Sequence, residues 1–340
     1  MAKLAIKAGM VLAGNVYSES GALLLSAGTK LNKHHIELLQ RHKIKMMDIG
    51  NLLKSDNPLK EAEESYSNIL TDLTAAFNSL RDKETLDDLE TREMLNCSNE
   101  LDQKADLDVI QLKEQIKQDD YLYQHSLNVG LISKHIAKIL GLGREEQKLL
   151  VQMGIFHDIG KFKVDPAIIN KPARLTDEEY NEVKNHSLYG YDLIKGTSLP
   201  NEIKIGTLLH HERLDGSGYP NGLKAGDIPF LVRILSVADT FDAICSKRVY
   251  KGGSSILFAV EELLEDAAKG RLDNAIVRPF TKDLMKAIIG KSIKLRNGQS
   301  AVITSVHPDR PNYPVLNIEG YPPLDLNEAN LALKQVAYLN

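Results

Sequence analysis

The sequence predicts a mainly α-helical protein: a helical bundle with small β-containing appendages at its N-terminal and C-terminal ends. Between residues 115 and 290, apolar residues recur at spacings of three and four, as at Leu127, Leu131 and Ile132. This period is typical of helices that bury one face. Both ends of the chain instead show short alternating segments around turn signals, which is typical of strands.

Residues 1–54 are expected to form a small mixed α/β domain. The segments GMVLAGNVY and GALLLSAG predict short strands, and Asn32 is placed to cap a helix over HHIELLQRH.

Residues 55–114 are charged, and the chain has neither glycine nor proline between Leu59 and Tyr121. Both features favour helix. We interpret this segment as a helical connector and as a candidate homodimer surface.

Residues 115–290 are expected to fold as an all-helical domain, with loops at the clusters of glycine and proline. Thr176 and Glu179 have the spacing of a capping box. We therefore predict a helix that begins there and carries His186 about two and a half turns further on.

Residues 291–340 are predicted to be a small β-rich region. The segment SIKLRNGQSAVITSV alternates apolar and polar residues, and Asn297-Gly298 predicts a two-residue hairpin turn within it.

Composition limits the ligands that the chain can bind. The 46 acidic and 42 basic residues give a formal net charge of −4. This balance supplies no basic field for long nucleic acid. A phosphate-bearing ligand must therefore be held by a few placed cations or by metal ions.

Cysteine content and hydropathy favour a cytoplasmic protein without membrane insertion. Cys97 and Cys245 are the two cysteines, and neither lies in a zinc-binding or redox motif. A reducing compartment follows from this usage. No apolar run reaches the length of a membrane span.

Histidines and aspartates in the helical domain form a candidate metal site. Imidazole and carboxylate groups together are ligands for divalent transition metals. Seven ligands suit two ions better than one, and two ions about 3.5–4 Å apart can assist phosphodiester hydrolysis. We expect iron or manganese, bound by His125, His157, Asp158, His186, His210, His211 and Asp239.

The other histidines are expected outside this site, since a single histidine is more often a surface or satisfied core residue. They are His34, His35, His42, His135 and His307. Lys161, about one helical turn beyond Asp158, is instead expected to face the site. There it can stabilise a phosphate oxygen or orient the nucleophile.

Several motifs occur in order along the helical domain: His125-Ser126, the segment HDIGK from His157, His186, the segment HHERLDGSGYP from His210, and VADTFDA around Asp239. Together they resemble the HD-GYP family, a branch of the HD-domain metal phosphohydrolases that degrades cyclic di-GMP in bacteria. The resemblance covers roughly residues 115–290.

The resemblance implies an HD-type helical bundle in which the seven candidate ligands match the metal-ligand positions and Asp158 bridges two ions. Lys161 matches the family's catalytic-site lysine. The resemblance also implies substrate contacts, which fall on Tyr219, Gly218, Pro220, Arg248 and Lys251. Some members carry a glutamate one turn before the first histidine that supports a third metal; here the position is Tyr121, which favours two ions.

We therefore expect a phosphodiesterase that opens cyclic di-GMP to pGpG; whether the product stops at pGpG or proceeds to GMP stays open. Hydrolysis of a mixed guanine-adenine cyclic dinucleotide stays open. So does a scaffold that senses nucleotide or binds signalling partner proteins with little turnover. A mononucleotide hydrolase is disfavoured, because a mononucleotide offers less for the GYP loop and the two basic residues to contact.

Overall fold

The computed structural model describes residues 11–12, 16–17, 23–25, 29–42, 53–54, 58–78, 83–104, 121–171, 173–248, 255–307 and 309–331. The chain divides into two compact units, Met1–Ser65 and Tyr66–Asn340. Each unit is described by itself.

The N-terminal unit combines short strands with one helix, as its sequence predicts. Two antiparallel pairs, β1 with β4 and β2 with β3, accompany α1. Asn32 precedes this helix, and its Oδ1 accepts a hydrogen bond from the His35 amide (2.9 Å), which confirms the predicted cap. The elements are β1 (Val11–Leu12), β2 (Val16–Tyr17), β3 (Leu23–Leu25), α1 (Lys33–Arg41) and β4 (Leu53–Lys54).

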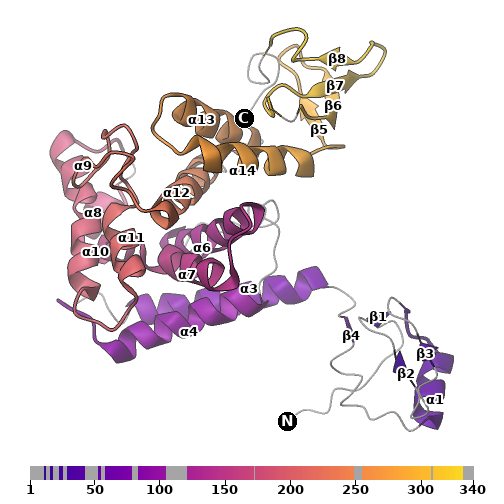
Figure 1. Cartoon of the computed structure of the whole chain (residues 1–340), viewed down its shortest axis with the longest axis horizontal. Helices are drawn as coiled ribbons and strands as arrows, with labels where there is room; N and C mark the ends of the chain where they lie inside the picture. Colours follow the sequence, from indigo (N-terminus) through magenta and orange to yellow (C-terminus); the bar gives the residue numbers. More distant parts are fainter. Residues whose placement is uncertain are drawn as a thin grey trace. The chain divides into compact units, whose positions relative to one another are not determined.

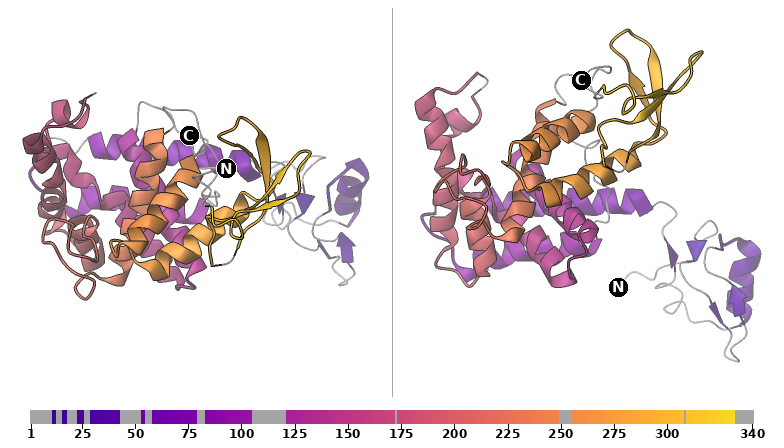
Figure 2. Two further views of the ribbon diagram at one scale, coloured as in Figure 1. Left: turned by 90° about the horizontal axis from the view of Figure 1, so that it is seen from above. Right: turned by 45° about the horizontal axis from the view of Figure 1, so that its top comes forward.

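The main unit is a helical bundle, which confirms the predicted fold class. At its centre, α6 (Tyr121–Ile139), α7 (Arg144–Phe156) and α12 (Phe230–Arg248) pack against one another (Figures 1 and 2). Around them lie η1 (Ile159–Lys163), α8 (Pro166–Ile169), α9 (Asp177–Lys184), α10 (His186–Ile194), α11 (Asn201–Leu209), α13 (Ser255–Ala268) and α14 (Asn274–Ala287).

The helices predicted as a connector contribute to the core of this bundle. Helix α3 (Pro58–Asn78) buries Leu73 and Phe77, and α4 (Asp88–Lys104) buries Met94, in the same apolar cluster as α6 and α7. The Leu86 amide also donates to the Leu193 carbonyl (2.9 Å). Hydrophobic burial of one helix face therefore makes both helices part of the bundle. The interpretation of residues 55–114 as a connector did not predict this packing.

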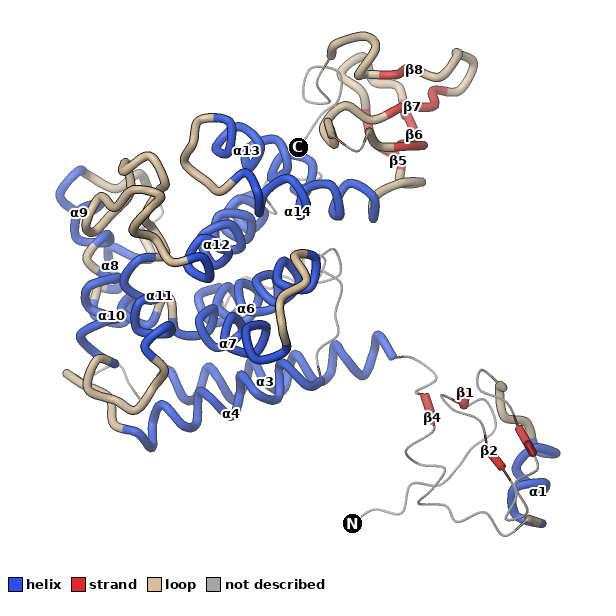
Figure 3. The backbone as a smooth tube through the Cα atoms, viewed as in Figure 1, coloured by secondary structure: helices blue, strands red, loops and turns tan. Residues whose placement is uncertain are grey.

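The C-terminal region forms a four-stranded antiparallel sheet in the order β5-β6-β7-β8, and the described strands are confined to the two ends of the chain (Figure 3). Its inward residues, such as Ile303 and Leu316, join the core of the bundle. The strands are β5 (Ser292–Lys294), β6 (Ser300–Ser305), β7 (Val315–Ile318) and β8 (Leu324–Asp325).

The predicted hairpin joins β5 to β6, but its turn is not the expected two-residue type. The Gly298 amide donates to the Leu295 carbonyl (2.9 Å), so Arg296 and Asn297 are the central residues. Gly298 follows them with φ +86°, a conformation that glycine adopts without steric cost. The asparagine–glycine pair thus marks the turn, displaced by one residue.

The region before His186 also differs from its prediction. The capping box is confirmed, because Thr176 and Glu179 exchange hydrogen bonds of 3.2 and 2.8 Å. However, α9 ends at Lys184 and His186 begins the next helix, α10. The His186 ring Nδ1 bonds the Val183 carbonyl (2.6 Å), a group that would otherwise serve the helix backbone.

No helix in the described ranges combines the length and the apolar character needed to cross a lipid bilayer.

Helix η1 and helix α10 approach closely at Gly160. A β-carbon at this position would lie 1.9 Å from the His186 carbonyl oxygen and 2.3 Å from the Gly190 amide nitrogen. Only glycine permits this contact, which brings the segment after His157 next to His186.

We predict that Gly160→Ala lowers the free energy of unfolding by about 3 kcal/mol, because backbone atoms must move to admit the methyl group. Urea denaturation measures the change. Gly196→Ala is the matched control, since a β-carbon there meets no atom within 4 Å. Equal stability of both variants would contradict the packing described.

Candidate metal centre

The seven predicted ligands converge on one site, and six of them are buried. Most of them stand at or next to helix ends. His125 lies in α6, His157 directly after α7, Asp158 directly before η1, His186 at the start of α10, His210 and His211 directly after α11, and Asp239 in α12.

Asp158 lies between two groups of imidazoles. Its Oδ2 is 3.4 Å from His125 Nε2 and 3.2 Å from His157 Nε2. Its Oδ1 is 3.3 Å from His186 Nε2 and 3.8 Å from His210 Nε2. Potential ligand atoms therefore gather in two sets, His125–His157–Asp158 and Asp158–His186–His210–His211, which share this carboxylate.

Asp239 is a second carboxylate that reaches both sets. Its Oδ1 is 3.1 Å from His125 Nε2, and its Oδ2 is 3.7 Å from His211 Nδ1. The site thus contains two aspartates, Asp158 and Asp239, and each lies near imidazoles of both sets.

Helix ends orient three of the rings. The Nδ1 atoms of His157, His186 and His210 bond the carbonyls of Gly154 (2.7 Å), Val183 (2.6 Å) and Thr207 (3.0 Å). Carbonyls in the last turn of a helix lack backbone partners. A ring that donates its Nδ1 proton to such a carbonyl keeps an unprotonated Nε2 for a metal ion.

His125 is oriented by a carboxylate instead. Its Nδ1 lies 2.7 Å from Oδ2 of Asp242, a fully buried residue that also accepts a hydrogen bond from Ser246 Oγ (3.2 Å). Asp242 is not among the site residues predicted from the sequence. Its signal is the spacing, because it follows Asp239 by three residues on α12 and so shares its face.

Burial keeps three histidines neutral. It lowers the pKa of His186 to about 4 and holds the pKa values of His210 and His211 well below the ordinary value. Neutral imidazole is the form that binds metal.

His125 behaves differently. Burial acts to lower its pKa, but hydrogen bonds to Asp158, Asp239 and Asp242 outweigh burial and raise the pKa well above the ordinary value. Burial likewise acts to raise the pKa values of Asp158 and Asp239, yet neighbouring histidines hold both well below the usual range. Both carboxylates are therefore ionised at neutral pH.

The residues present fit a divalent metal. Oδ1 of Asp158 is buried and accepts no hydrogen bond from the part of the chain that the structure describes. A buried charged oxygen without a partner is costly, and a cation is the partner that this donor set suits. The cluster therefore has the chemistry of a divalent metal site.

Lys161 reaches the same site. Its Nζ lies 2.5 Å from Asp158 Oδ2, and its side chain is 20% exposed. The turn that carries it is the 3-10 helix η1, so the expected α-helical turn is wrong, although the spacing still brings the two side chains together.

The loop after His211 covers one side of the site. The Tyr219 ring stacks on the His211 ring, with centroids 4.7 Å apart and an angle of 30°. Burial, followed by the charges of Asp239 and Asp158, raises the pKa of Tyr219, so its phenol is neutral. Pro220 follows it in the same half-buried loop.

Gly218 and Glu212 hold this loop in place. A β-carbon on Gly218 would lie 2.5 Å from the His211 carbonyl oxygen, so this glycine serves packing of the loop on its own backbone. Glu212 is buried, and its two carboxylate oxygens accept the amides of Asn221 (2.7 Å) and Leu223 (2.8 Å). Glu212 is likewise not among the site residues predicted from the sequence.

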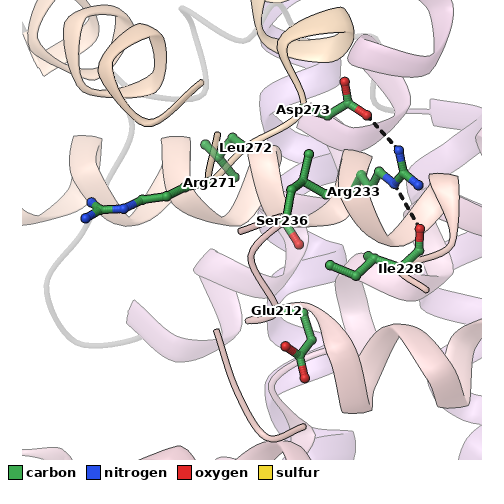
Figure 4. Close-up of a pocket in the computed structure, with 8 residues that line it drawn as sticks. Glu212, Ile228, Arg233, Ser236, Arg271, Leu272 and Asp273 are labelled. Carbon is green, nitrogen blue, oxygen red and sulfur yellow. Dashed lines mark hydrogen bonds and ion pairs between the residues drawn. The ribbon is translucent and has the colours of Figure 1, made fainter. Parts of the chain in front are cut away.

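A small pocket behind this loop is separate from the metal centre, since none of the seven ligands lines it. Arg233 forms one wall and bonds Asp273 (3.0 Å) and the Ile228 carbonyl (2.9 Å) (Figure 4). These contacts tie the segment after the loop to α12.

Three residues named in the sequence predictions lie wholly or in part outside the residues that the structure describes. The side chains of Arg248, at the end of α12, and of Tyr121, at the start of α6, are not described, and Lys251 lies outside the described residues. Among described residues, the histidines expected elsewhere stand outside both ligand sets: His34, His35, His42, His135 and His307.

Comparison with known proteins matches residues 108–276 to the HD domain family. A 3′3′-cGAMP-specific phosphodiesterase of Vibrio cholerae is 37% identical over 46% of this chain, and a cyclic di-GMP phosphodiesterase of Pseudomonas aeruginosa is 33% identical over 56%. The chain spans 36% and 45% of the length of these relatives.

Among solved structures, the chain is similar to Bd1817, described as an HDG"Y"P protein from Bdellovibrio bacteriovorus. The TM-score is 0.51 at 16% identity, and the match covers 83% of this chain and 96% of the other. At this identity the match supports the fold.

We predict that Asp242→Ala weakens metal binding by roughly 10–100-fold, the usual cost of removing a partner that orients a ligating histidine. Calorimetric titration with Mn²⁺ measures the affinity. Asp283→Ala is the control, because Asp283 makes a comparable bond (2.8 Å) to His135, outside the site. Unchanged affinity in Asp242→Ala would show that His125 needs no such partner.

We also predict that metal binding at pH 7 releases about one proton per chain, because the raised pKa keeps His125 protonated until an ion takes its Nε2. Affinity should accordingly rise with pH up to that pKa. Titrations in buffers of different ionisation enthalpy measure the release. A heat that is independent of the buffer would refute a protonated His125.

Proposed function

We propose that the chain contains an HD domain of the HD-GYP type and is a metal-dependent phosphodiesterase acting on a cyclic dinucleotide. The observation that carries this proposal is Asp158, whose two oxygens face different sets of histidines. A shared carboxylate suits a pair of ions. When bound, such ions supply Lewis-acid stabilisation to the oxygens of an in-line phosphoryl displacement.

The chain's own residues take distinct roles in this proposal. Asp158 and Asp239 hold the metal ions together with the five histidines. Lys161 extends its ammonium group into the site, where it stabilises charge on a phosphate oxygen. Tyr219 bounds the substrate space with a neutral phenol, and Gly218 and Pro220 shape its loop.

The proposal also includes two basic residues whose side chains are not described, as contacts for the substrate. Arg248 and Lys251 bind substrate phosphates, because a guanidinium offers a bidentate fork and an ammonium a point charge. They supply the local positive charge that a net charge of −4 does not.

The proposed reaction converts cyclic di-GMP to pGpG, with hydrolysis to GMP as an open second step. A relative named for 3′3′-cGAMP at 37% identity favours the mixed guanine-adenine dinucleotide as the second candidate substrate. A sensing scaffold is disfavoured, since a protein that only binds nucleotide has no need of seven converging ligands and Lys161.

The proposal extends to the identity of the metal, the cellular compartment and the protein partners. Iron or manganese suits the nitrogen and oxygen ligands. Cys97 and Cys245 are free thiols, which supports a reducing, cytoplasmic compartment. A homodimer through residues 55–114 and signalling partner proteins stay predictions.

The deciding experiment incubates purified protein, loaded anaerobically with iron or manganese, with cyclic di-GMP, 3′3′-cGAMP and simple mononucleotides. Chromatography separates the products. We expect linear dinucleotide from a cyclic dinucleotide. Tight binding of that nucleotide without any product would favour the scaffold, and turnover of mononucleotides alone would favour an ordinary HD nucleotidase.

We predict about two metal ions per parent chain, which elemental analysis measures. Asp158→Ala should abolish turnover and lower the metal content, because the carboxylate shared by both ligand sets is lost and Asp239 alone remains as an acidic ligand. His135→Ala should change neither quantity, since His135 pairs with Asp283 elsewhere. A normal metal load in Asp158→Ala would contradict the shared-ligand assignment.

A further inference from the structure

The side chain that follows Lys161 is held between two helices. The Phe162 ring stacks on Phe77 of α3, with centroids 5.1 Å apart and an angle of 27°, and on Tyr123 of α6 at 6.0 Å and 22°. Phe77 and Tyr123 also contact each other at 5.7 Å. Three rings from α3, α6 and η1 thus form one aromatic cluster beside the metal centre.

The two helix rings are themselves fixed. Phe77 is 2% exposed within the main core. Tyr123 donates its hydroxyl hydrogen to Oδ1 of Asn78 (2.7 Å), the residue next to Phe77. The cluster therefore joins the end of α3 to Tyr123, which lies two residues before the candidate ligand His125 on α6.

A second contact fastens α3 to α6 further along. The Tyr66 hydroxyl donates to Oδ1 of Asn128 (2.8 Å), and Tyr66 is 4% exposed. Asn128 lies about one helical turn after His125. Two contacts, one through Tyr123 and one through Asn128, thus attach α3 to α6 on either side of His125 along the helix.

Such attachment matters for Lys161 because η1 is short. It spans five residues, Ile159–Lys163, and a single 3-10 turn has little rigidity of its own. Aromatic pairs add stabilisation beyond the burial of their surface. A displacement of about 1 Å at a reacting group can cost about 100-fold in rate.

We propose that Phe162 and Phe77 are positioning residues, which hold η1 so that Lys161 points into the metal centre. This inference rests on the proposed function for its kinetic test. It also assigns α3 a part in the site, although α3 lies outside the residues 108–276 that match the HD domain family.

The first test compares Phe162→Leu and Phe77→Leu with the parent. Both should lower kcat roughly 10–100-fold with KM and metal content unchanged. Phe162→Tyr keeps the ring and should retain the parental kcat. Leu73→Ala removes buried packing from the same helix without a ring, and its kcat per folded molecule should match the parent.

A double-mutant cycle separates positioning from general packing. In a Lys161→Ala background, Phe162→Leu should cause no further loss of kcat, because the group that it positions is absent. An additional loss as large as in the parent background would overturn the proposal.

The second test is independent of turnover. Acetic anhydride labels exposed lysines, and mass spectrometry compares Lys161 with Lys195, whose side chain is 54% exposed and serves as the internal reference. In metal-free protein, Phe162→Leu and Phe77→Leu should speed the relative labelling of Lys161 several-fold, whereas Leu73→Ala should not. If the parent hydrolyses no nucleotide but labelling changes as stated, the proposed function fails and the positioning role stands. Unchanged labelling in both leucine variants would overturn the positioning role.

Discussion

The site depends on one constraint, the sharing of the buried Asp158 carboxylate between two sets of histidines. An ionised aspartate without enough partners is costly in a protein interior, so its surroundings must supply partners to both of its oxygens. His125, His157 and Lys161 approach Oδ2, and His186 approaches Oδ1. Helices α6, α7 and α10 are brought together at this carboxylate, and the close contact at Gly160 follows from the same requirement.

Helix ends provide the accuracy that such a centre needs. Rings of His157, His186 and His210 each use one nitrogen to satisfy a carbonyl of a terminal helical turn, which fixes both tautomer and direction. The same bonds therefore complete the helices and prepare the ligands. Glu212 fixes the loop that carries Tyr219 in a similar way, because its carboxylate accepts hydrogen bonds from two backbone amides of that loop.

Sequence could predict the helical bundle and the seven converging ligands because both leave local signals: helical periodicity, and histidine–aspartate motifs in order. The role of Phe77 could not be predicted, since its partner Phe162 lies far along the chain and no short motif marks the contact. Asp242 and Glu212 lie within the motifs around Asp239 and His210, but their partners became evident only in the structure. The one-residue displacement at Gly298 and the helix break before His186 were also missed. Before His186, the bond from its ring Nδ1 to the Val183 carbonyl competes with the helix backbone. At Gly298, backbone hydrogen bonds close the turn one residue earlier than the motif suggests.

The most direct measurement of the central claim is anomalous X-ray diffraction from crystals of the metal-loaded protein. We expect two ions, one on each side of Asp158, with Oδ2 bound together with His125 and His157, and Oδ1 bound together with the second histidine set. A single ion, or two ions of which only one contacts Asp158, would contradict the account.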